Sequence, residues 1–296
     1  MSRRGLGGLY SRFRRVVGEE GLAEALARAV WYASVRVASK LRRVEWAHLQ
    51  PQEELLAKLF AEREFTLIIL DACRYDYFRE VYRQYLDGYL RPVRSPASCT
   101  GRWLRTVFVV FGDWLSDVKL FSAHPRINSK GIAVRGFSVR DYFRGQIIDV
   151  WDWGWDWELG TVHPDTVVKA VLDEGLGDRN IIWFMQPHLP YIGETKLLVP
   201  KEVIKGKMAG RFLTRMLRTG RISRQYLTQA YRDNLALALK AVKKLLAQVG
   251  ELRGRWVVTS DHGELLGEHG VTLHPSYLDL PEQRIVPWLE LKAPPT

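Results

Sequence analysis

Short apolar runs that end in polar residues are the feature that most limits what this chain can fold into. Four runs of strand length occur, at residues 65–70, 118–121, 180–185 and 255–260. Amphipathic stretches separate them, and residues 226–249 show helical spacing. Apolar strands that alternate with helices are typical of a parallel sheet with helices on its faces. We therefore expect an α/β fold with a mainly parallel central sheet.

The size and composition favour one large domain. The chain has 296 residues, 47% of them hydrophobic, and no stretch has the composition of a linker. Its two cysteines, Cys73 and Cys99, do not make a disulfide framework. No apolar run reaches the roughly 18 residues of a membrane span, and the N-terminus lacks the pattern of a secretory signal. These features predict a cytoplasmic protein, peripheral at a membrane if it contacts one.

The charge favours an anionic partner. The net charge is +11, and the first 43 residues hold ten basic and three acidic residues. Leu26, Val30 and Val37 recur at helical spacing within residues 19–43. We expect a basic helical N-terminal region, residues 1–62, that binds an anionic membrane surface, or else a helix with a solvated basic face. Nucleic-acid binding is not expected, because no known binding motif accompanies the charge.

Polar residues follow three of the four apolar runs. Asp71 follows the first run, residues 186–188 follow the third, and Asp261 and His262 follow the fourth. Ligands of open α/β sheets bind just beyond the carboxyl ends of the strands. The sequence therefore predicts that these groups meet in one site.

The strongest motif is the stretch 259–270, Thr-Ser-Asp-His-Gly-Glu-Leu-Leu-Gly-Glu-His-Gly. A carboxylate and an imidazole side by side suit one divalent metal, and Gly263 allows a sharp turn behind them. An isolated Asp-His-Gly would more often cap a helix. The extended motif, with His274 and residues 281–287, resembles the signature of sulfatases and phosphoethanolamine transferases in the alkaline phosphatase and sulfatase superfamily.

This resemblance covers residues 65–291 and implies a three-layer α/β/α sandwich, with a catalytic domain at residues 63–296. It also implies that Asp261 and His262 bind the catalytic metal, and that His274 holds the substrate or a second metal. Asp71 stands where superfamily members have a metal-binding acid. Many sulfatases have a second acid next to it, where this chain has Ala72. Zinc or manganese is therefore expected before calcium or magnesium.

The nucleophile is expected in residues 95–104, where a loop leads into a helix. In the superfamily the nucleophile lies four residues before an arginine or histidine. That spacing selects Ser98 with Arg102, and Thr100 is the second candidate because several branches use threonine. Cys99 is the third candidate, and it is out of register for the formylglycine of sulfatases.

Residues 186–191, Gln-Pro-His-Leu-Pro-Tyr, resemble the His-x-Pro-Tyr segment of sulfatases. The resemblance implies that His188 contacts the ester oxygens or the leaving group. No acid follows His188 closely, so a permanent second metal is not expected.

These residues combine into one mechanistic hypothesis. Asp71, Asp261, His262 and Ser98 hold one divalent metal, and Ser98 attacks an anionic ester, with phosphate favoured over sulfate. Arg102, His188 and His274 hold the oxygens and the leaving group. A transferase of the phosphoethanolamine or phosphoglycerol type, acting on lipid or glycan, is the first alternative to this hydrolase. A non-catalytic scaffold that binds polyanions or membranes is the second.

Overall fold

The computed structural model describes residues 22–133, 136–200, 202–203 and 208–292, which form parts of two compact units. The first unit, residues 1–44, contains helix α2 (Leu22–Leu41), close to the predicted helix 19–43. The apolar side chains of Leu26, Val30 and Val37 on α2 are each more than half exposed. The first 21 residues of the predicted N-terminal region lie outside the described residues. Over the part of the chain that is described, no helix has the length and apolar content to cross a membrane.

The second unit, residues 45–296, is built on a seven-stranded sheet with the strand order β2-β11-β8-β1-β7-β3-β4. Strand β1 lies at its centre, between β7 and β8, and pairs in parallel with both. Strand β3 pairs in parallel with β7 and β4, whereas β11 runs antiparallel to β8 and β2. The strands are β1 (Phe65–Leu70), β2 (Gly88–Arg94), β3 (Lys119–Ser122), β4 (Gln146–Ile148), β7 (Arg179–Phe184), β8 (Arg255–Thr259) and β11 (Ile285–Leu291).

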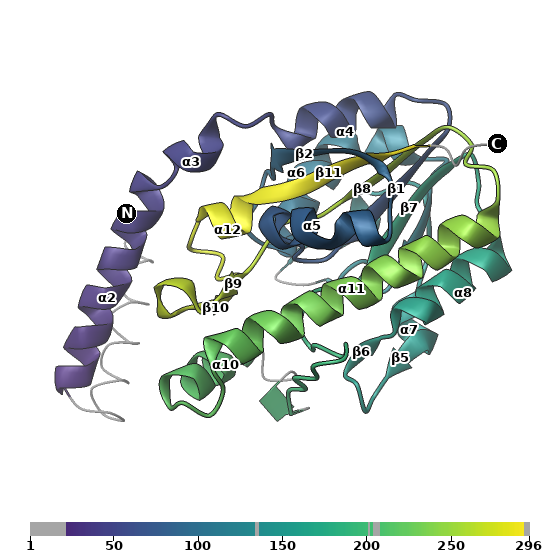
Figure 1. Ribbon diagram of the computed structural model, residues 1–296. Coiled ribbons are helices and arrows are strands. Elements are labelled where there is room, and N and C mark those ends of the chain that lie inside the picture. Colours follow the sequence, from purple (N-terminus) through teal and green to yellow (C-terminus); the bar gives the residue numbers. More distant parts are fainter. Residues whose placement is uncertain (1–21, 134–135, 201, 204–207, 293–296) are drawn as a thin grey trace. The chain divides into compact units, whose positions relative to one another are not determined.

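Helices cover both faces of this sheet. Leu67 and Ile69 of β1 pack into one core with α4 (Gln52–Phe60) and α6 (Thr100–Phe111). Ile68 and Leu70 pack into the other core with α5 (Tyr75–Val81), α8 (Pro164–Glu174) and α11 (Arg224–Val249). Figure 1 shows α11 crossing its face of the sheet beside α8. The predicted three-layer α/β/α fold with a mainly parallel sheet is confirmed.

Shorter elements fill the rest of the described chain. They are α3 (Val44–Ala47), α7 (Val150–Gly154), β5 (Trp155–Asp156), β6 (Thr161–Val162), α10 (Ala209–Arg218), β9 (Leu265–Leu266), β10 (Thr272–Leu273) and α12 (Pro281–Arg284). Helix α10 packs on β10, which directly precedes His274.

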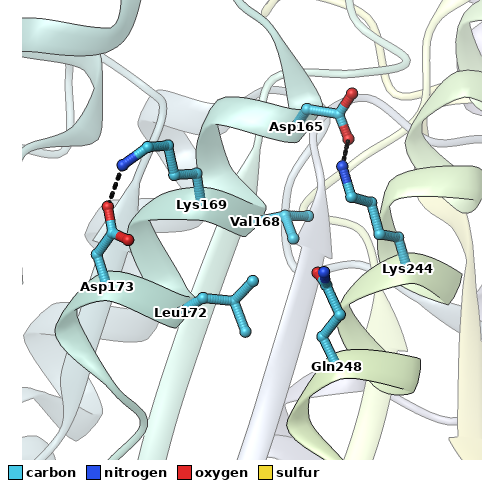
Figure 2. Close-up of a pocket in the computed structure, with 7 residues that line it drawn as sticks. All are labelled: Asp165, Val168, Lys169, Leu172, Asp173, Lys244 and Gln248. Atoms are coloured by element: carbon cyan, nitrogen blue, oxygen red, sulfur yellow. Dashed lines mark hydrogen bonds and ion pairs between the residues drawn. The ribbon is translucent and has the colours of Figure 1, made fainter.

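A surface pocket is lined by residues of α8 and α11 alone (Figure 2). Its two lysines are both paired, Lys169 with Asp173 and Lys244 with Asp165. Paired cations leave little positive potential for an anionic ester, and none of the predicted site residues lines this pocket.

Candidate active site

The carboxyl ends of the central strands bring the predicted ligands together. Asp71 follows β1, and Asp261 with His262 follows β8, the parallel neighbour of β1. Ligand atoms of these three residues lie within 4.8 Å of one another, and all three side chains are buried. The Nε2 atom of His262 is 3.3 Å from Asp261 Oδ2 and 3.9 Å from Asp71 Oδ1.

The hydrogen bonds of these side chains leave one oxygen unused on each of the two carboxylates. Asp261 Oδ1 accepts from the backbone N–H groups of Ala72 and His262. Asp71 Oδ2 accepts from Trp183 Nε1 and lies 3.4 Å from Nε2 of His124. His262 Nδ1 donates to the carbonyl of Gly263, which leaves a lone pair on Nε2.

The unused atoms fit a divalent cation. Asp71 Oδ1 and Asp261 Oδ2 are buried and accept no hydrogen bond from any described residue. Burial and the negative charge of Asp261 raise the pKa of Asp71 well above its usual value. A cation between the two carboxylates would reverse this repulsion, since opposite charge favours the ionised form. Two carboxylate oxygens and one imidazole nitrogen form a donor set suited to zinc or manganese.

Three candidate nucleophiles stand at the start of α6. Thr100 is the first helical residue, and its hydroxyl donates to His262 Nε2 over 3.0 Å. Ser98 is also buried, but its Oγ has no hydrogen-bond partner among the described residues. Burial raises the pKa of the Cys99 thiol, which disfavours the thiolate. Arg102, two residues beyond Thr100, is exposed.

A second polar group adjoins the first. His188, Glu264 and His274 also offer ligand atoms within 4.8 Å of one another, and the rings of His274 and His262 are 4.3 Å apart. His188 Nε2 lies 2.8 Å from His274 Nε2, and His188 Nδ1 donates to the carbonyl of Leu189. Burial lowers the pKa of both histidines, that of His188 to about 4. Both rings therefore favour the neutral form, in which the lone pair of His188 Nε2 can hold a metal and the N–H of His274 Nε2 can donate to an ester oxygen.

Glu264 was part of the quoted motif but received no role in the sequence analysis. No acid lies close to His188 in the sequence, whereas Glu264 comes from the loop after β8. Burial raises the pKa of Glu264 to about 8, and its Oε1 accepts from the Tyr191 hydroxyl over 2.8 Å. Its position in the motif was the available signal.

Glycine is required at position 263 for a reason other than the predicted sharp turn. Its backbone does not need the left-handed conformation. A Cβ atom at this position would lie 2.2 Å from the carbonyl oxygen of Glu282. The Gly263 N–H donates to the carbonyl of Gln283 over 2.9 Å. Glycine is needed because the metal-ligand loop packs directly on the backbone of α12.

Tyr231 of α11 holds the backbone just after Asp71. Its hydroxyl donates to the Ala72 carbonyl over 2.8 Å and accepts from the Arg74 N–H over 2.9 Å. Ala72 has φ of 58°, which costs a non-glycine residue on the order of 1 kcal/mol. We expect Tyr231→Phe to weaken metal binding about 10- to 100-fold, because the backbone that aims Asp71 loses its support. Metal affinity by isothermal titration calorimetry measures this.

Tyr226→Phe is the matched control, since Tyr226 lies on the same helix and also donates to a carbonyl, that of Lys196. Adding Ala72→Gly to Tyr231→Phe should recover part of the metal affinity, because glycine adopts positive φ without strain. Equal affinity in Tyr231→Phe and the wild type would refute the role of Tyr231.

Comparisons with known proteins support the fold. No protein-family model and no curated protein sequence matches the chain. Among solved structures, it is similar to the integral membrane protein lipooligosaccharide phosphoethanolamine transferase A from Neisseria meningitidis, with 14% identity and a TM-score of 0.51 over 77% of this chain. Two further matches are the periplasmic domain of a phosphoethanolamine transferase from Campylobacter jejuni and a phosphonate monoester hydrolase from Agrobacterium radiobacter. The first has 17% identity and a TM-score of 0.46, and covers 76% of this chain and 78% of that one. The second has 13% identity and a TM-score of 0.44, and covers 77% and 68%.

The chain spans 48% of the length of the Neisseria transferase. The match to the Neisseria protein corrects the predicted cytoplasmic location, because the same fold occurs in an integral membrane transferase. The prediction rested on two unpaired cysteines and on the missing apolar run. Neither feature distinguishes the cytoplasm from other compartments, because a domain with a large hydrophobic core can fold without disulfides inside or outside the cytoplasm.

Proposed function

The chain has the fold of the alkaline phosphatase and sulfatase superfamily, and we propose that it is a metal-dependent enzyme that cleaves a phosphoric ester by way of Thr100. The observation that carries this proposal is the convergence of the Thr100 hydroxyl, His262 Nε2 and two unpaired carboxylate oxygens at one sheet edge. Ser98, which sequence spacing placed first, is the alternative nucleophile.

In the proposed reaction, Thr100 Oγ attacks phosphorus in line with the departing alcohol. The Oγ–P bond forms as the P–O bond to the alcohol breaks, and the hydroxyl proton of Thr100 ends on that alcohol. Water then attacks the phosphothreonine, which releases phosphate and restores the hydroxyl. A divalent metal held by Asp71, Asp261 and His262 would supply positive charge that lowers the pKa of the neighbouring hydroxyl.

His274 suits the role of holding an ester oxygen. Because His188 Nδ1 donates to the Leu189 carbonyl, the Nε2 atom of the neutral His188 ring carries a lone pair, and His274 Nε2 donates the hydrogen bond between the two rings. An incoming ester can take over the N–H of His274, while the lone pair of His188 can bind a metal or accept a proton. Glu264 adds a buried acid within reach of both rings.

Transfer to an acceptor alcohol is the second candidate, and the likeness to the Neisseria phosphoethanolamine transferase favours it. The two candidates share every step up to the phosphothreonine. They differ only in whether water or an alcohol attacks it. Added glycerol or ethanolamine should lower the ratio of free phosphate to released alcohol only if the enzyme is a transferase.

An anionic membrane surface remains the proposed partner of the N-terminal helix. The exposed apolar side chains on α2 and the excess of basic residues in the first 43 positions support it. A non-catalytic scaffold that binds polyanions or membranes is the remaining alternative, and it predicts that the protein turns over no ester.

A turnover panel tests the proposed function. Aryl phosphate monoester, phosphate diester and sulfate are each offered to the chelator-treated protein with zinc, manganese, magnesium or calcium. We expect release from a phosphate ester that depends on added zinc or manganese. Preferred release from the sulfate would exclude the phosphate assignment. No release from any ester, by a protein that binds the metal, would favour the non-catalytic scaffold.

A further inference from the structure

Arg126 has no role in the site as derived so far, and the sequence analysis did not identify it. It lies in the loop after β3, whose carboxyl end is at the same sheet edge as those of β1 and β7. Its backbone N–H donates to His124 Nδ1 over 3.0 Å, and His124 in turn lies against Asp71. The loop therefore fixes Arg126 to the metal-ligand group through a single intervening side chain.

The Arg126 guanidinium reaches the start of α6. A Cβ atom placed on Gly101 would lie 4.0 Å from Arg126 Nη1 and would meet nothing nearer. Gly101 directly follows Thr100, so the cation lies at the first turn of α6, the turn that carries Thr100. The N–H groups of Thr100 and Gly101 donate to no described residue, as is usual for the first turn of a helix.

The guanidinium makes no hydrogen bond, ion pair or ring contact with any described residue, although Arg126 is partly buried. Its charge acts on the groups around the site. Burial is the main reason that the pKa values of His124, His188 and His274 lie below the usual value, and the positive charge of Arg126 lowers each of them further. A partly buried cation without a partner is stabilised when a ligand supplies the opposite charge.

Arg102, the arginine that sequence spacing selected for the oxyanion, is placed differently. It is exposed on α6, and its charge partly offsets the rise that burial causes in the pKa of Cys99. Arg126 acts on Cys99 and also on Asp71 and the two site histidines. The loop after β3 therefore brings a cation closer to the reacting atoms than the helix does.

We infer that Arg126 is a catalytic residue that binds the unbridged oxygens of the ester's phosphoryl group, together with the N–H groups at the start of α6. This inference rests on the proposed function, since it concerns the same site. A planar guanidinium binds two oxygens of a tetrahedral oxyanion at once. Held beside Thr100, it also stabilises the negative charge that these oxygens carry in the transition state.

The test measures two quantities, the binding of inorganic phosphate to the zinc- or manganese-loaded protein by calorimetry and the turnover of an aryl phosphate monoester. We expect Arg126→Gln to weaken phosphate binding about tenfold or more, and to lower kcat/KM about 100-fold or more. Arg126→Lys keeps the positive charge but loses the planar pair of N–H donors, so its losses in phosphate binding and in kcat/KM should lie between those of Arg126→Gln and the wild type. Arg144→Gln, at an exposed arginine, is the matched control and should equal the wild type.

Metal affinity and thermal unfolding are measured for each variant, and neither should fall below the wild-type value in Arg126→Gln, because the substitution removes an unpaired cation near the site. If phosphate binding and turnover are unchanged in Arg126→Gln but reduced in Arg102→Gln, Arg102 has the role and the inference about Arg126 is refuted. The proposed function would stand in that case. Phosphate binding that depends on Arg126 in a protein that turns over no ester would support the inference and refute the proposed function.

Discussion

Replacing Thr100 with alanine is expected to lower the rate of ester cleavage by at least about 10³-fold, while metal affinity changes far less. Thr100 Oγ1 is the hydroxyl within 3.0 Å of His262 Nε2, so its loss removes the group that forms the bond to phosphorus. A loss of 10³-fold corresponds to about 4 kcal/mol of transition-state stabilisation. Initial rates with the aryl phosphate monoester, in the metal that supports turnover, measure the effect.

Two variants separate chemistry from folding. Thr106→Ala makes the same change at an exposed position of α6 and should retain the wild-type rate. Thr100→Ser keeps a hydroxyl at the start of the helix and should recover much of the activity. Mass spectrometry of protein quenched during turnover should find one phosphoryl group on the peptide that contains Thr100.

Ser98→Ala decides between the two hydroxyl nucleophiles. We expect a smaller loss than in Thr100→Ala, because Ser98 lies before the first helical residue and its hydroxyl makes no hydrogen bond with any described residue. A phosphoryl group found on Ser98, together with a greater loss in Ser98→Ala, would make Ser98 the nucleophile. The distance between Thr100 and His262 would then reflect a structural hydrogen bond.

The central strands could be predicted from sequence because burial on both faces leaves a simple pattern. Every residue of β1 is buried, and in β7 and β8 only the first residue is partly exposed, so each is a continuous apolar run. The residue that follows such a run is fixed at the sheet edge, which is why Asp71, Asp261 and His262 could be placed together. The edge strand β2 has six partly or fully exposed positions out of seven. Because its sequence contains polar residues, it does not show the apolar run by which the central strands could be predicted.

Side chains supplied by loops could not be predicted in the same way. His124 and Arg126 reach the site because β3 happens to lie beside β7, a pairing that no local pattern contains. Glu264 was visible in the motif, but its partner Tyr191 lies 73 residues away. The choice among Ser98, Cys99 and Thr100 depends on where α6 begins, and helix ends are the least certain part of a sequence-based assignment.

Asp261→Asn is expected to weaken metal binding by about 10²-fold or more without weakening the metal-free fold. The two oxygens of Asp261 have separate tasks. Oδ1 accepts from the N–H groups of Ala72 and His262, and an asparagine oxygen can keep both bonds. Only the buried, unpaired Oδ2, 3.3 Å from His262 Nε2, is replaced, and an amide NH₂ cannot ligate a cation.

The two states of the protein should respond in opposite directions. Without metal, Asp261→Asn removes a buried negative charge beside Asp71, so its free energy of unfolding should equal or exceed that of the wild type. With metal at 100 times its dissociation constant, the wild type should gain about 2.7 kcal/mol and the variant much less. Urea unfolding with and without the metal, alongside calorimetric affinities, measures both effects.

Asp113→Asn, at an exposed acid, serves as the control and should show the full stabilisation by metal. A metal-free Asp261→Asn protein that is clearly less stable than the wild type would indicate that Oδ2 has a structural partner. Full stabilisation of the variant by metal would place the cation elsewhere, with the group of His188, Glu264 and His274 as the remaining candidate donor set in the described part of the chain. The sign of the metal-free change therefore separates a carboxylate kept for metal binding from one kept for the fold.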